Sequence, residues 1–141
     1  MNDCIFCEIA TSKKLASIVY RDTRCTAFMD IKPINPGHVL IIPNDHAASL
    51  NELDEVTGGH IFQIAQKITR ALYNSPIKCE GITYYLADGE AANQEIFHVH
   101  LHVFPRFIGD EVRLKVPSSY YTKHTEQSEL DNMSDIIKEY L

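Results

Sequence analysis

The decisive stretch of this sequence is His98-Val99-His100-Leu101-His102-Val103-Phe104. Successive side chains of a β-strand point to opposite faces of the sheet, so a strand here would place three histidines on one face and apolar residues on the other. Histidine accounts for 7 of the 141 residues, and three at alternate positions would arise by chance in roughly 2% of such chains. The histidine face is either an ordinary half-exposed polar face or a functional site, because imidazole can act as nucleophile, proton donor and metal ligand near neutral pH.

Hydrophobic patterns on either side of this stretch predict the remaining elements. One long amphipathic helix over residues 59–73 is predicted by apolar residues on a single face, namely Ile61, Ile64, Ala65, Ile68, Ala71 and Leu72. Runs rich in β-branched and aromatic residues predict strands over 17–20, 25–31, 38–42, 81–87 and 96–104. Strands in hairpin order with one long helix inserted predict an α+β fold on a mostly antiparallel sheet.

The ends of the chain and one helix start carry weaker signals. A short helix over residues 4–10 is predicted, and Ser49-x-x-Glu52 fits a capping box. A C-terminal helix is indicated by the apolar residues Leu130, Met133, Ile136, Ile137 and Tyr140.

Length and composition limit the class of protein. The chain has 141 residues, of which 45% are hydrophobic and 23% charged, as in an ordinary single globular domain. We therefore expect one domain over residues 1–141, in which residues 111–141 form an extension without a recognisable motif.

The net charge of −6 argues against nucleic acid or an anionic membrane as the main partner. The sequence shows neither a secretory signal nor an apolar run of about 20 residues, which predicts a cytoplasmic location.

Two cysteines near the N-terminus form the motif Cys4-x-x-Cys7. In a reducing compartment this spacing favours a metal or redox site over a disulfide. Two thiolates and two imidazoles would complete a tetrahedral structural zinc site. The alternative is a pair of unliganded thiols on a short helix.

Several motifs together resemble the histidine triad family of nucleotide hydrolases and transferases, in particular its zinc-bearing bacterial-type branch. They are the His98–His102 pattern followed by Phe104-Pro105-Arg106, the segments Phe28–Ile31 and Pro36–Pro43 with His46, the opening Cys4-Ile5-Phe6-Cys7-Glu8, and the loop Gly89–Glu95. The resemblance covers residues 4 to about 110. It implies a five-stranded, mostly antiparallel sheet with one long helix and short terminal helices.

The resemblance also implies a mechanism and a set of site residues. His100 would attack the α-phosphate of a nucleotide and form a covalent nucleotidyl-histidine, which water then hydrolyses. To present a neutral nitrogen for this attack, His100 should hold its other nitrogen against an acceptor such as a backbone carbonyl. His102 and His38 would contact the phosphate, and Asp30 would accept hydrogen bonds from the ribose. The remaining expected nucleotide contacts are Phe28, Ile31, Phe6, Gln94, Glu95, Ile96 and Asp88, and the expected zinc ligands are Cys4, Cys7, His46 and His98.

The function implied is hydrolysis of purine nucleoside phosphoramidates with release of the nucleoside monophosphate. Hydrolysis of dinucleoside polyphosphates is an alternative that uses the same residues. If the protein is not an enzyme, the alternatives are a non-catalytic nucleotide sensor and a zinc-stabilised interaction module. By resemblance we also expect a homodimer whose two-fold axis passes the long helix and the strand at residues 81–87, since pairing would cover an exposed sheet edge.

Three positions depart from the pattern of the family. Asp88 stands near a position where asparagine is common, and Glu95 stands where serine is common. An ionised Glu95 accepts hydrogen bonds but does not donate them, would repel a second phosphate and would attract a cationic amine. Asn93 occupies the place of a glycine, and asparagine tolerates a positive φ better than most residues do.

Overall fold

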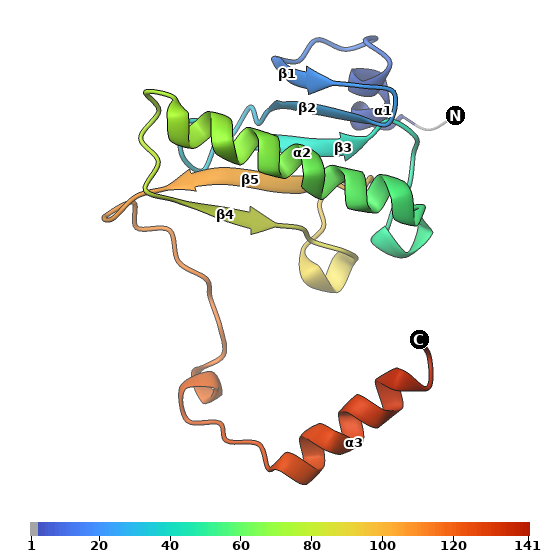
Figure 1. Ribbon diagram of the computed structural model, residues 1–141, viewed down its shortest axis with the longest axis vertical. Coiled ribbons are helices and arrows are strands. Elements are labelled where there is room, and N and C mark those ends of the chain that lie inside the picture. The colour runs from blue at the N-terminus through green and yellow to red at the C-terminus, as the bar shows by residue number, and fades with distance from the viewer. Residues whose placement is uncertain (1–2) are drawn as a thin grey trace. The chain divides into compact units, whose positions relative to one another are not determined.

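The computed structural model describes residues 3–141 and contains a five-stranded antiparallel sheet in the order β1-β2-β3-β5-β4 (Figure 1). The strands are β1 (Ile18–Arg21), β2 (Cys25–Met29), β3 (Val39–Pro43), β4 (Gly81–Tyr85) and β5 (Leu101–Arg106), and the helices are α1 (Ile5–Ala10), α2 (Glu55–Asn74) and α3 (Gln127–Lys138). The predicted α+β class, the antiparallel sheet, the long helix and the short terminal helices are confirmed.

The central strand β3 is buried on both faces and divides the core in two. Val39 and Ile41 point into a cluster that α2 covers with Ile61, Ile64 and neighbouring residues. Leu40 and Ile42 point to the opposite face, where Phe6 and Ile9 of α1 cover them together with Phe28. Because α1 is only six residues long, it covers part of that face and leaves room for a site beside it.

Helix α2 begins four residues earlier than its hydrophobic pattern predicts and runs through Gly58 and Gly59. Its N-cap is Asp54, whose side chain accepts a hydrogen bond from the backbone N–H of Thr57 at 2.9 Å. The predicted capping box at Ser49 is wrong, because Ser49 makes no capping hydrogen bond and only a short 3-10 turn, Leu50–Glu52, follows it. The Glu52 side chain instead accepts from the backbone N–H of Ala48, the residue before Ser49.

Strand β5 begins at Leu101, five residues later than predicted, so the sheet ladder does not include His98 or His100. Before Leu101 the chain bonds to the loop after β3 instead, and the N–H of Val99 donates to the carbonyl of Ala47. The predicted alternation is nevertheless present, because Val99, Leu101 and Val103 all lie in the core beneath α2. The histidines therefore share the opposite side, as the alternation predicts.

Contacts divide the chain into two compact units, one ending at Glu111 and the other spanning Val112–Leu141. The second unit contains a 3-10 turn, Ser118–Tyr121, and helix α3, which confirms the predicted C-terminal helix although Tyr140 lies beyond its end. Across residues 3–141, no helix has the combined length and apolar character that crossing a membrane would require.

A half-buried ion pair joins α2 to the turn between β1 and β2. His60 Nε2 lies 2.5 Å from Asp22 Oδ2, and both side chains are 23% exposed. Burial raises the pKa of Asp22, but hydrogen bonds from His60, from the N–H groups of Cys25 and Arg24 and from Tyr20 outweigh it and hold that pKa well below its usual range. The hydrogen bond to Asp22, and a second one to Gln63, raise the pKa of His60. Each partner thus favours the charged form of the other.

The ion pair should make the stability of the fold depend on pH. The His60 contribution is fully present below its ordinary pKa and is lost as pH rises through the raised value in the folded protein, whereas the Asp22 contribution is lost as pH falls below its ordinary value. His60→Gln should therefore lower the free energy of unfolding by about 1–2 kcal/mol near pH 5.5 and by less near pH 9. Urea denaturation at both pH values measures this, with His124→Gln as the control. An equal loss at the two pH values would show that the pair contributes no charge interaction.

Candidate functional site

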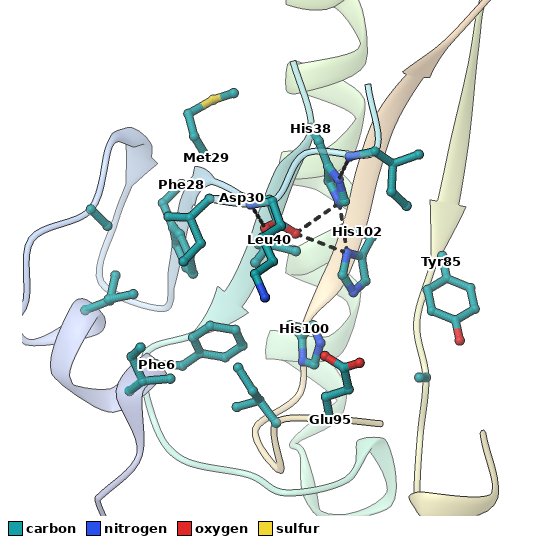
Figure 2. Close-up of a pocket in the computed structure, with 18 of the residues that line it drawn as sticks. Phe6, Phe28, Met29, Asp30, His38, Leu40, Tyr85, Glu95, His100 and His102 are labelled. Atoms are coloured by element: carbon teal, nitrogen blue, oxygen red, sulfur yellow. Dashed lines mark hydrogen bonds and ion pairs between the residues drawn. The ribbon is translucent and has the colours of Figure 1, made fainter. Parts of the chain in front are cut away.

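A cavity of about 620 Å³ lies beside α1, on the face of the sheet opposite α2 (Figure 2). It is lined by nine of the residues predicted to contact a nucleotide: Phe6, Phe28, Asp30, Ile31, His38, Glu95, Ile96, His100 and His102. These residues come from α1, from β2 and the turn after it, from the start of β3 and from both sides of the β5 start. The fold therefore assembles in one place most of the residues that the sequence singled out.

His100 holds its proton on the nitrogen that faces away from the cavity. Its Nδ1 lies 2.7 Å from the carbonyl oxygen of His98. A carbonyl only accepts, so Nδ1 carries the hydrogen and Nε2 of the neutral ring keeps a lone pair. The expected bond to a backbone carbonyl is confirmed. The side chain is 6% exposed and lies at the cavity wall, so the lone pair faces an enclosed space rather than bulk water.

A chain of hydrogen bonds joins the other two histidines of the cavity. The backbone N–H of Ile34 donates to His38 Nδ1 at 3.0 Å, and His38 Nε2 lies 2.9 Å from His102 Nδ1. Burial lowers the pKa of His38, although the nearby charge of Asp30 opposes that effect. Burial, followed by the charges of His100 and His38, lowers the pKa of His102 to about 4. Both rings are therefore neutral at neutral pH.

Asp30 places one carboxylate oxygen in a turn and the other toward these histidines. Its Oδ1 accepts from the backbone N–H of Lys32 at 2.8 Å. Its Oδ2 lies 3.6 Å from His38 Nε2 and 4.0 Å from His102 Nδ1. The structural role in the turn and a role in ligand binding are thus compatible, because each uses a different oxygen.

The opposite end of the cavity is apolar. Phe6 packs edge-on against Phe28 with ring centroids 5.5 Å apart, and edge-on against His100 at 5.2 Å. Ile9 and Leu40 add to the same wall, while Ile31 is 89% exposed at the rim. A flat aromatic group could enter between this wall and the rim, since apolar and aromatic faces favour such contacts.

The loop before the triad supports the cavity through Gln94, whose side chain does not line it. The Gln94 amide accepts from the N–H of Gly89 and donates to the carbonyl oxygens of Ala48 and Ile96. Asp88 is likewise not among the described lining residues, and its carboxylate accepts from the backbone N–H of Leu50. Asn93 has a φ of 63°, which confirms the expected left-handed turn. The exposed side chain of Glu95 lines the cavity near His100 (Figure 2).

Three polar lining residues were not found by the sequence reasoning: Tyr85, Lys14 and Lys32. Tyr85 is the cross-strand partner of His102, with ring centroids 5.6 Å apart. Only the register between β4 and β5 brings these two residues together, and no local pattern encodes that register. The lysines lie in irregular segments without a motif, so nothing in the sequence marked them.

The four predicted metal ligands gather next to the cavity. Cys4 and Cys7 of the N-terminal segment meet His46 and His98, and all four ligand atoms lie within 4.8 Å of one another. His98 Nδ1 lies 3.4 Å from Cys4 Sγ, 3.5 Å from Cys7 Sγ and 3.3 Å from His46 Nδ1. Ligand atoms bound tetrahedrally to zinc at 2.0–2.3 Å are separated by about 3.3–3.8 Å. The geometry of this cluster therefore fits such a site.

The hydrogen bonding around the cluster also fits a metal. His98 Nε2 lies 2.8 Å from the carbonyl oxygen of Pro43 and must carry the hydrogen, so Nδ1 directs its lone pair at the sulfur atoms. Burial, followed by the neighbouring Cys4, raises the pKa of the Cys7 thiol to about 11. A dication among these groups would reverse that effect, because metal-bound cysteine is deprotonated.

The comparisons with known proteins agree with this geometry. Residues 11–109 match the HIT domain, the histidine triad domain. An uncharacterised HIT-like protein of Borreliella burgdorferi is 43% identical over 112 residues, which are 78% of this chain and 80% of that protein.

Solved structures give the same result. The crystal structure of a HIT family protein from Bacillus anthracis has a TM-score of 0.89 at 32% identity, covering 99% of this chain and 98% of that one. A zinc-bound histidine triad family protein from Mycobacterium smegmatis has a TM-score of 0.76 at 34% identity, covering 82% and 84%. A histidine triad nucleotide-binding protein from Candida albicans has a TM-score of 0.84 at 28% identity, covering 98% and 96%. Together with the matched domain, the triad and the Cys/His cluster, these similarities show that the chain belongs to the histidine triad family.

Proposed function

We propose that this protein is a nucleotide hydrolase that cleaves nucleoside phosphoramidates through a covalent intermediate on His100. The observation that carries the proposal is the 2.7 Å hydrogen bond from His100 Nδ1 to the carbonyl of His98. This bond keeps the lone pair on Nε2, which is the nitrogen available to a ligand in the cavity. An imidazole held in this way is an activated nucleophile that needs no separate base.

The proposed reaction has two steps. In the first, His100 Nε2 forms a bond to the α-phosphorus, the bond from phosphorus to the leaving amine breaks, and the amine departs with a proton taken up from solvent. In the second, water attacks the same phosphorus and releases a proton to solvent, the bond to His100 breaks, and the nucleoside monophosphate leaves. The ring N–H of His102 would stabilise the negative charge that builds on the phosphate oxygens. His38, whose Nε2 lies 2.9 Å from His102 Nδ1, would hold His102 in place.

The rest of the nucleotide would occupy the remainder of the cavity. The apolar wall of Phe6, Phe28 and Ile31 suits a purine base. Asp30 Oδ2 would accept hydrogen bonds from the ribose hydroxyls, since Oδ1 is engaged by Lys32. The relative from Candida albicans is a nucleotide-binding protein, which supports a ligand of this class here.

Replacing the proposed nucleophile should separate catalysis from binding. His100→Ala should reduce turnover of an adenosine phosphoramidate by a factor of about 10³ or more, because the covalent route is removed. AMP binding should persist to within about tenfold, since the base and ribose contacts lie elsewhere. Turnover is followed by release of AMP and binding by calorimetry, with His124→Ala as the control. If His100→Ala turns over at a rate near wild type, His100 is not the nucleophile. If the wild type itself turns over neither a phosphoramidate nor a diadenosine polyphosphate, the result favours a non-catalytic nucleotide sensor.

We also propose a structural zinc ion at Cys4, Cys7, His46 and His98. When bound, zinc would supply charge and coordination geometry that hold deprotonated thiols against neutral imidazoles. Cys4 and Cys7 would then tie the N-terminal segment and α1 to the residues that precede β5. Because α1 provides Phe6 to the cavity wall, the same cluster would also stabilise the site.

Elemental analysis tests the zinc proposal directly. Protein purified without a chelator should contain about one zinc ion per chain, and Cys7→Ser should contain much less. A strong chelator should lower the melting temperature of the wild type by roughly 10 °C or more, because metal binding adds to folding stability. Cys79→Ser is the matched control, since Cys79 lies outside the cluster. Metal-free protein with an unchanged melting temperature would refute the proposal.

Glu95 suggests which leaving group the site prefers. Its carboxylate lines the cavity on the same side as His100. A carboxylate there repels a second phosphate and attracts a positively charged amine, even where the effective dielectric constant is about 20. We therefore infer a preference for phosphoramidates of cationic amines, such as a lysine-like group, over dinucleoside polyphosphates.

The preference can be measured as a ratio of catalytic efficiencies. Glu95→Gln should lower the ratio of kcat/KM for a cationic phosphoramidate to kcat/KM for a diadenosine polyphosphate by about tenfold, because the variant loses one charge interaction. Glu90→Gln, a charge change elsewhere in the same loop, should leave the ratio unchanged. A ratio that stays constant or rises in Glu95→Gln would mean that Glu95 is only a solvated loop residue.

A second copy of the chain is the partner that the exposed surface favours. Phe62 and Tyr73 of α2 are 55% and 53% exposed, and β4 is an edge strand whose Tyr84 is 45% exposed. The hydroxyl groups of Thr69 and Tyr84 are hydrogen-bonded, so these two elements form one continuous surface. Pairing across a two-fold axis would cover both the apolar side chains and the strand edge.

A further inference from the structure

For neutral rings, the proton positions in the His38–His102 pair follow from the hydrogen bonds. His38 Nδ1 faces the N–H of Ile34. Because that nitrogen accepts, the single hydrogen of a neutral His38 ring must be on Nε2. His38 Nε2 then donates to His102 Nδ1. His102 must in turn carry its own hydrogen on Nε2, the nitrogen that remains free to meet a ligand.

We propose that the backbone N–H of Ile34 is a positioning group that locks both His38 and His102 as Nε2–H tautomers, so that His102 always presents an N–H donor to the reacting phosphate. The inference rests on the proposed function for the role of that donor, although the tautomers themselves do not depend on it. Without the Ile34 N–H, either nitrogen of His38 could carry the hydrogen. His102 could then present a lone pair to the phosphate, and a lone pair repels a phosphate oxygen instead of stabilising it.

The turn that carries this N–H is anchored from outside the cavity. Asn35 Nδ2 donates to the carbonyl of Pro105 and to Asp110 Oδ2, both at 2.9 Å, and the carbonyl of Asn35 accepts from the N–H of His38. Arg106 holds Asp110 with two hydrogen bonds of 2.6 and 3.0 Å. Gly37 has a φ of 97°, and a Cβ there would lie 3.0 Å from Pro105 Cγ. The turn therefore sits tightly on the end of β5, and the Ile34 amide has little freedom to move away from His38.

The same atoms could be mistaken for a second metal site. The separations of His38 Nε2, His102 Nδ1 and Asp30 Oδ2 are 2.9, 3.6 and 4.0 Å. The circle through the three atoms has a radius of about 2.1 Å. Its centre therefore lies at a typical zinc–nitrogen distance from each atom. A metal on His38 Nε2 would require the hydrogen to move to Nδ1, where it would collide with the N–H of Ile34. A ligand histidine needs an acceptor at its other nitrogen, and His38 has a donor there.

Ring ¹⁵N NMR tests the tautomers in the unmodified protein. In the zinc-loaded wild type at neutral pH, His38 and His102 should both be protonated on Nε2, whereas His100 should be protonated on Nδ1. His38→Gln and His102→Gln assign the signals. Observation of His38 or His102 protonated on Nδ1 would overturn the proposal. A second zinc ion per chain that is lost in Asp30→Asn would also overturn it.

A backbone variant tests the positioning role. Ile34→Pro removes the N–H, whereas Ile34→Val keeps it and should retain the wild-type tautomers. Ile34→Pro should show mixed tautomers at His38 and a kcat about fivefold to tenfold below that of Ile34→Val, the effect expected for one hydrogen bond, with KM within about twofold. A lower melting temperature with wild-type tautomers and unchanged kcat would indicate a purely structural role and overturn the proposal. If the predicted tautomers are seen but no form of the protein turns over nucleotide, the proposed function fails and the assignment of the tautomers stands.

Discussion

The hydrogen bond from His100 Nδ1 to the carbonyl of His98 sets the chemical character of this site. A neutral imidazole has one hydrogen for two nitrogens, and the group opposite one nitrogen decides what the other can do. Here the carbonyl of His98 leaves a lone pair at the cavity, and the carbonyl of Pro43 does the same for His98 toward the cysteines. The N–H of Ile34 has the reverse effect and leaves a donor on His102 through His38. Backbone groups thus give chemically identical side chains three different tasks.

The architecture makes these backbone partners available. Because β5 starts only at Leu101, the carbonyl of His98 is not part of the β3–β5 ladder and can accept from a side chain. The central strand β3 contributes side chains to both hydrophobic clusters. Helix α2 covers the cluster on one face of the sheet, and the short helix α1 covers only part of the other face. The cavity occupies the remaining part. A longer N-terminal helix would cover that space and leave no room for a ligand.

Much of this arrangement could be predicted from local patterns. The period of Ile61, Ile64 and Ile68 predicted the buried face of α2, and the alternation of His98 to Val103 predicted which side the histidines share. The gathering of Cys4, Cys7, His46 and His98 followed from the resemblance to a family and not from spacing, because the residues are far apart in the chain. What could not be predicted depends on pairing between distant segments. The late start of β5 reflects a bond from Val99 to Ala47, and the place of Tyr85 in the cavity reflects the β4–β5 register. The amide of Gln94 bonds to the backbone and does not line the cavity, although its place in the loop was equally compatible with a ligand contact. The cap of α2 is Asp54, although Ser49 was an equally plausible cap from the local sequence.

The identity of the atom that bonds to phosphorus during turnover tests the proposed mechanism most directly. Rapid quenching of the wild type with an adenosine phosphoramidate at alkaline pH, followed by peptide mass spectrometry and ³¹P NMR, locates any nucleotidyl group. We predict an adenylyl group on His100, attached through Nε2, that forms and decays at rates compatible with turnover. An adduct on Nδ1 or on another residue, or AMP release with inversion at phosphorus in a single displacement, would contradict it.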